Sequence, residues 1–184
     1  PALMTLCGGR WFRQIPLPDV ARVTTLCRVG DAVWLVGGHK RGGMAFAARY
    51  FALDLELEEL RVPPVRAVIA GVGDPDSEQG LLGGAEGTVL WYERGDLAQE
   101  TLPTRFDIAS VALDRAGGAW VAGASRMAYR NPTEGRGRWE IAWVDEREVT
   151  PFVSLFAHSG QLVAMTAEAH ILEGIARDRH TGAR

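Results

Sequence analysis

Three carboxylates lie within five residues of the chain, at Asp74, Asp76 and Glu78. Calcium binds loops that are rich in carboxylate oxygens, so this spacing raises the question of a cation site. The segment lacks the turn glycine and the distal bidentate acid of a calcium-binding loop. It also lies where the rest of the chain has short hairpin turns. We therefore interpret it as an exposed turn insertion and predict no metal site.

Other residues that could carry chemistry show no catalytic spacing. The glycine-rich segment 80–88 resembles a phosphate-binding loop, but it has no lysine and no helix is expected after it. The histidines have no metal-ligand spacing, and no Gly-x-Ser-x-Gly motif accompanies them; they are His39, His158, His170 and His180. The sequence predicts no cofactor and no catalytic residue, although acids gathered from distant strands would leave no local motif.

Composition restricts the class of protein. The chain has 184 residues, 47% apolar and 23% charged, with a net charge of -3. We expect a soluble protein, because no apolar run approaches the roughly 20 residues of a membrane helix. Positive charge is interspersed with negative charge, which argues against nucleic-acid binding. Cys7 and Cys27 are expected to be free thiols, with a single bridge between them left open.

The elements that must position any site come from an internal repeat. Glycine-turn segments recur at 30–38, 79–84, 117–123 and 159–165. From Gly38 to Gly84, Gly123 and Met165 the spacing is 46, 39 and 42 residues. This is the period of small sheets that stack as repeats.

The clearest repeat unit predicts a four-stranded antiparallel sheet. Its strands are expected at Phe106–Asp114, Ala119–Gly123, Arg126–Arg130 and Arg138–Asp145, joined by turns that contain glycine or proline. The same order recurs in 22–62 and 65–102. Four-stranded sheets at this period are the blades of a β-propeller, so we predict an all-β propeller fold.

The fourth unit has three predicted strands, at Phe152–Ala157, Gln161–Thr166 and His170–Glu173. Segment 10–18 begins with the same Arg-Trp pair as the strand at 138–145, so we expect it to complete this sheet and close a four-bladed ring. Segment 2–7 is a second candidate for the third strand of this sheet, beside His170–Glu173. The alternative is a fragment of a ring of five to eight blades. We expect one domain over 1–176 and a polar tail over 177–184.

The unit at 108–130 resembles the bacterial two-component-regulator propeller repeat, and it is also similar to repeats of photosystem-assembly-factor-like propellers. The resemblance rests on Asp114, the glycines at 117 and 118, Trp120 and Gly123. It is partial at 30–38 and weak in the other two units. Families of this kind mostly use the ring as a sensor or interaction platform, which is what the resemblance implies here.

Basic residues are expected in the loops of one propeller face. They are His39, Lys40, Arg41, Arg105 and Arg126. Together they would form a positive rim suited to an acidic peptide or protein surface; the alternative is ordinary solvated charge.

The leading hypothesis is a non-catalytic interaction or sensing module. The alternatives are a carbohydrate- or small-molecule-binding propeller, as lectin or glycan-active enzyme, and an accessory domain cut from a longer chain. The sequence leaves the oligomeric state open. The chain begins at Pro1 without a methionine, so the compartment stays open as well, with the cytoplasm slightly favoured.

Overall fold

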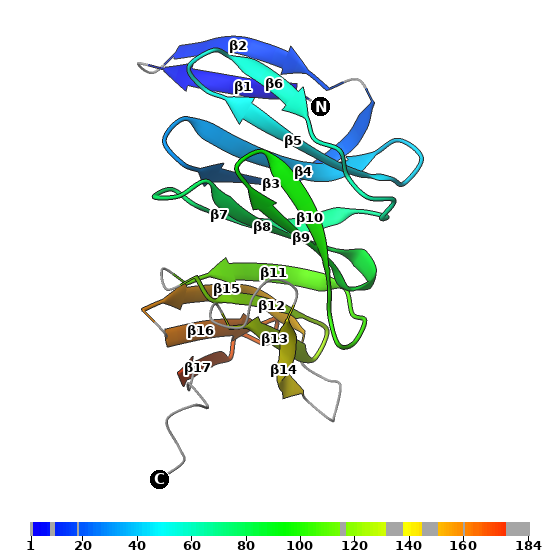
Figure 1. Ribbon diagram of the computed structural model, residues 1–184, viewed down its shortest axis with the longest axis vertical. Helices are drawn as coiled ribbons and strands as arrows, with labels where there is room; N and C mark the ends of the chain where they lie inside the picture. Colours follow the sequence, from blue (N-terminus) through cyan, green and yellow to red (C-terminus); the bar gives the residue numbers. More distant parts are fainter. Residues whose placement is uncertain are drawn as a thin grey trace.

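The structure, a computed structural model, describes residues 2–7, 10–17, 19–114, 117–131, 138–144, 151–159 and 161–175. Its sheets stack on one another along the long axis of the molecule (Figure 1). Among the described residues, no helix is long and apolar enough to span a membrane.

Three four-stranded sheets form the middle of the stack, and each follows chain order. Blade 1 contains β3 (Val20–Val29), β4 (Val33–Lys40), β5 (Ala45–Phe51) and β6 (Glu56–Glu59). Blade 2 contains β7 (Val68–Asp74), β8 (Gln79–Gly84), β9 (Thr88–Glu93) and β10 (Asp96–Thr101), with the short 3-10 turn η1 (Ala85–Gly87) before β9. Blade 3 contains β11 (Ile108–Leu113), β12 (Ala119–Gly123), β13 (Arg126–Arg130) and β14 (Trp139–Val144). Neighbouring strands are antiparallel, as in propeller blades.

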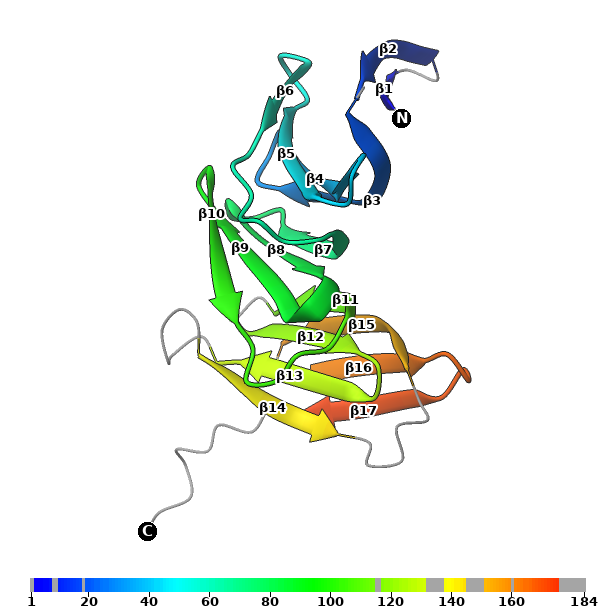
Figure 2. The ribbon, with the colours of Figure 1, turned by 90° about the vertical axis from the view of Figure 1, so that its right-hand side faces the viewer.

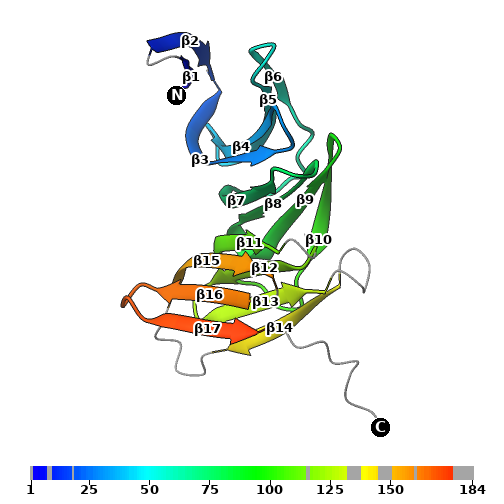
Figure 3. The same cartoon turned by 90° about the vertical axis from the view of Figure 1, so that its left-hand side faces the viewer.

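Smaller sheets lie at the two ends of the stack. Blade 4 contains β15 (Phe152–His158), β16 (Gln161–Thr166) and β17 (Ile171–Ile175). At the other end, β1 (Ala2–Cys7) and β2 (Arg10–Pro16) form a hairpin of their own (Figure 1). The first strands β3, β7, β11 and β15 lie along one side of the stack and the fourth strands β6, β10 and β14 along the other (Figure 2 and Figure 3).

The core consists of apolar layers between successive sheets. Leu35 of blade 1 packs with Leu82 and Leu90 of blade 2, and Trp91 of blade 2 packs with Val121 of blade 3. The same kind of layer joins blade 3 to blade 4 and the hairpin to blade 1. Each sheet therefore depends on its neighbours to bury its apolar residues, which is the energetic basis of a repeat protein.

The predicted ring closure is wrong. Strand β2 pairs with β1, from Ala2 opposite Pro16 to Cys7 opposite Arg10, and blade 4 ends at β17 without it. Within the described residues, no strand pairing joins the two ends of the stack. The physical reason is local: a hairpin closes a very short loop, whereas pairing β2 with β17 would close almost the whole chain, at a larger entropic cost.

The pairing of the first and second strands changes one residue assignment in the sequence repeat, that of the fourth unit. In all four blades the first strand carries a bulge, and the residue before it faces Gly38, Gly84, Gly123 or Thr166. Thr166, and not Met165, is therefore equivalent to the three glycines. The glycines allow the backbone of the segment that enters each blade to lie close to the end of the second strand. A Cβ at Gly123 would overlap the carbonyl oxygen of Asp107, and a Cβ at Gly38 or Gly84 would likewise overlap a backbone carbonyl oxygen.

Candidate functional site

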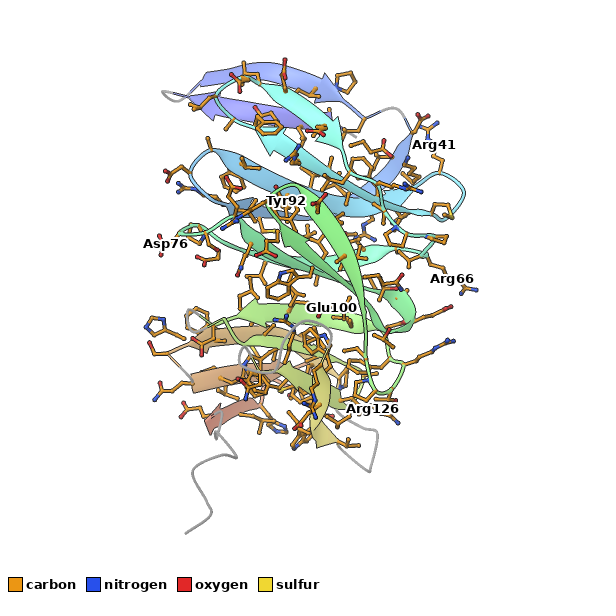
Figure 4. The ribbon with its side chains drawn as sticks, viewed as in Figure 1. Arg41, Arg66, Asp76, Tyr92, Glu100 and Arg126 are labelled. Carbon is orange, nitrogen blue, oxygen red and sulfur yellow. The ribbon has the colours of Figure 1, made fainter. Side chains whose placement is uncertain are left out.

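The loops between second and third strands gather on one face of the stack. In blade 1 the Arg41 N–H donates to the carbonyl oxygen of Asp19 at 2.9 Å. The Ala85 N–H likewise donates to Ala67 O at 3.2 Å in blade 2, and Ala167 N–H to Pro151 O at 2.9 Å in blade 4. Each of these loops thus contacts the segment that enters its blade. We call this side the loop face; Arg41, Arg66 and Arg126 lie along it and Asp76 lies on the opposite side (Figure 4).

A cavity of about 410 Å³ opens on the loop face. Its lining comes from four segments: 64–66 before β7, 85–88 around η1, 99–102 at the end of β10, and 104–105 before β11. Blade 2 therefore supplies most of its walls, and the segment that enters blade 3 supplies the rest. Arg66 and Arg105 bring positive charge to the cavity, and Glu86 and Glu100 bring negative charge.

Arg105 is the one predicted rim residue that lines this cavity directly. It is exposed, and within the described part of the chain its guanidinium has no carboxylate partner. Its neighbour Arg66, in contrast, has a 3.0 Å ion pair with Glu86. The Glu86 N–H in turn donates to Asp107 Oδ1 at 2.8 Å. The charge that stays available for a ligand here is that of Arg105.

Arg126 lies beside the same cavity. Its Nη1 donates a 2.5 Å hydrogen bond to Oγ1 of Thr104, which is a lining residue. Arg126 begins β13 directly after Ser125, which has a positive φ of 55°. Arg126 thus contacts Thr104 of the cavity lining, and Arg105 is itself part of that lining.

The other three predicted rim residues lie in blade 1. His39 and Lys40 belong to strand β4 and not to the loop after it, because β4 runs to Lys40. Lys40 forms an ion pair with Glu59 of β6, so its charge is largely compensated. Arg41 is exposed in the turn that follows β4. It is not among the described residues that line the cavity. The five predicted rim residues therefore lie in two places: three are in blade 1, and Arg105 and Arg126 are at blade 3.

Glu100 was not anticipated from the sequence. Glu100 is one of the residues that line the cavity, and its side chain is buried, with an exposure of 3%. Trp139 Nε1 donates to its Oε2 at 2.7 Å, and Arg130 Nε lies 3.4 Å from the same oxygen without hydrogen-bond alignment. The guanidinium of Arg130 stacks over the Trp91 ring, 4.4 Å from its centroid. No local motif marks this cluster, because its members come from two blades.

The acidic segment at 74–78 forms the turn between β7 and β8, on the side opposite the loop face (Figure 4). The Asp76 N–H donates to Asp74 Oδ1 at 3.0 Å, and the Ser77 hydroxyl donates to Asp74 Oδ2 at 2.8 Å. Both carboxylate oxygens of Asp74 are thus used to hold the turn. Across the described ranges, no group of three His, Cys, Asp or Glu side chains is placed to hold a metal ion.

Comparison with known proteins supports the architecture alone. No family model matches the chain, and no curated protein matches it. The crystal structure of the computationally designed Ika4 protein, a designed β-propeller, is similar with a TM-score of 0.66 and 12% sequence identity. The match covers 85% of this chain and 92% of the Ika4 chain. The chain therefore has a propeller-type fold of stacked blades, and fold alone assigns no function.

Proposed function

We propose that the protein is a non-catalytic binding module that holds an acidic segment of a protein partner on its loop face. The observation that carries this proposal is Arg105, an exposed cation in the wall of the cavity whose charge is not compensated by any described carboxylate. A guanidinium in this setting can bind a carboxylate through two parallel hydrogen bonds.

The charges around the cavity favour an extended acidic ligand over a single anion. Lys40 and Arg66 are already paired with Glu59 and Glu86. Arg41 on the loop face and Arg105 in the wall of the cavity remain as exposed cations. A peptide with several carboxylates can contact both, whereas one small anion contacts only the cavity. Exposed ion pairs contribute about 0.2–1 kcal/mol each, so we expect weak binding that decreases at high salt.

The size of the cavity favours a second candidate, a small polar ligand such as a carbohydrate. Its volume of about 410 Å³ lies within the range of roughly 300–1,000 Å³ for ligand pockets. Its lining includes residues with hydroxyl and amide side chains, such as Thr101, Thr104 and Gln99. The described lining contains no aromatic ring on which a sugar could stack. Binding on a glycan array that Gln99→Ala abolishes would favour this candidate over the acidic peptide.

The test of the proposal is fluorescence anisotropy with a fluorescein-labelled hexaglutamate peptide, at low and at high salt. Wild-type protein is expected to bind at low salt, and Arg105→Gln is expected to weaken binding by up to about fivefold, roughly 1 kcal/mol. The matched control is Arg94→Gln. Arg94 is also an exposed arginine, but its N–H donates to Glu78 O in the turn on the opposite side. Equal binding by the two variants would contradict the role of Arg105.

A further inference from the structure

One end of the stack carries an uncovered apolar surface, and the other end carries an uncovered apolar side chain. At one end, the outer face of blade 4 exposes Phe156 to 65%, Ile171 to 66% and Met165 to 42%. At the other end, Leu26 of β3 is 51% exposed. Large apolar side chains that cluster on an exposed sheet face usually mark an interaction surface.

The exposed face of blade 4 repeats an interface that the molecule already uses. The bulges in β11 and β15 align Ser110 with Ser154 and fix which positions are equivalent. By register, Phe156, Val163, Met165 and Ile171 of blade 4 correspond to Ala112, Trp120, Ala122 and Met127 of blade 3. In blade 3 these four residues are at most 8% exposed, because blade 4 covers them. Blade 4 therefore presents the surface on which a further blade would pack.

Leu26 belongs to the complementary half of that interface. It pairs with Val36, which pairs in turn with Ala48, and these two are fully buried in the layer beneath the β1–β2 hairpin. The residue equivalent to Leu26 in blade 4 is Leu155, which packs against blade 3 and is 8% exposed. The hairpin thus covers part of this face of blade 1 and leaves the first-strand position uncovered.

We infer that a second copy of the chain covers these surfaces, with blade 4 of one copy packed against blade 1 of the other. Each copy carries the uncovered face of blade 4 at one end and, at the other end, the equivalent of the face that meets it, which the hairpin covers except at the first strand (Figure 1). A head-to-tail contact of this kind joins copies either into a closed ring or into an open filament. Two copies related by a twofold axis make the contact twice and close a propeller ring in which neither face stays exposed.

The mass of the purified 184-residue chain in solution tests this inference. Light scattering is expected to give twice the chain mass of 20.0 kDa. Phe156→Arg and Leu26→Glu, one at each end, are each expected to give a monomer. Circular dichroism establishes that each variant is folded, and Met165→Arg replaces Phe156→Arg if the latter fails to fold.

Mixing the two variants separates head-to-tail pairing from other arrangements. A mixed dimer keeps one unmodified interface, between blade 4 of the Leu26→Glu chain and blade 1 of the Phe156→Arg chain, so the dimer mass is expected to return. A monomeric wild-type protein would overturn the inference. A dimer that persists in Leu26→Glu would also overturn the inference, because it would show that two blade 4 faces pack on each other. Open-ended assemblies of the wild-type protein would overturn it as well.

Discussion

The indole Nε1 of Trp139 donates a 2.7 Å hydrogen bond to the carboxylate Oε2 of Glu100, and this bond joins the fourth strands of blades 2 and 3. The same oxygen lies 3.4 Å from Nε of Arg130, and all three side chains are buried. A buried carboxylate is retained only where donors and an opposite charge compensate its lost hydration. Glu100 therefore fixes part of the cavity lining, and its contacts with Trp139 and Arg130 connect blade 2 to blade 3.

Glu100→Ala is expected to lower the free energy of unfolding by about 3–5 kcal/mol, because it leaves Arg130 charged and buried without its carboxylate. Urea unfolding monitored by tryptophan fluorescence measures the change. Asp96→Ala is the control, since Asp96 lies on the same strand and is exposed; its effect is expected to stay within about 0.5 kcal/mol. Equal effects of the two substitutions would show that the buried cluster adds no stability.

Gly123→Ala is expected to destabilise the fold by about 1–3 kcal/mol, because the added Cβ would overlap the carbonyl oxygen of Asp107 and force the backbones apart. Thr166→Val, at the equivalent position in blade 4, replaces only the hydroxyl that accepts from His170 N–H. That loss is expected to cost about 0.5–1.5 kcal/mol. Thermal unfolding of the two variants compares them. An unchanged midpoint for Gly123→Ala would contradict the close approach.

Burial raises the pKa of the Cys27 thiol to about 12. In a Cys7→Ser background, Cys27 is therefore expected to react with a disulfide reagent at about pH 8 far more slowly in the native protein than in denaturant, because the thiolate is the reactive species. The unfolded chain loses this proton at lower pH than the folded one, so stability is expected to fall as pH rises from the ordinary thiol value toward 12. Cys27→Ala should remove that part of the pH dependence. A native reaction rate equal to that of a free thiol would contradict the burial.

Much of the fold could be predicted from the sequence because its signals are local. Alternating apolar residues and glycine turns located β11 to β13 and β15 to β17 closely. The partner of β2 could not be predicted in this way. The Arg10-Trp11 pair matches Arg138-Trp139 and indicates the type of strand, but two residues do not specify the sheet that the strand joins.

The candidate site was predictable only in part, for the same reason. Arg105 and Arg126 were expected on one face because equivalent loops of a propeller share a face. The charges that modify the site come from partners distant in the chain, such as Glu59 for Lys40 and the Glu100 and Trp139 pair. These pairings depend on how strands and blades stack, which no local pattern encodes.

Charge reversal on the loop face tests the proposed binding role most directly. Anisotropy titrations compare wild-type protein with the Arg41→Glu, Arg105→Glu double variant, using labelled hexaglutamate and hexalysine peptides at equal ionic strength. Wild-type protein is expected to prefer hexaglutamate, and the double variant is expected to lose that preference and bind hexalysine more tightly than wild type does. The same peptide preference in both proteins, with the fold intact by circular dichroism, would contradict the assignment of the loop face as the binding surface.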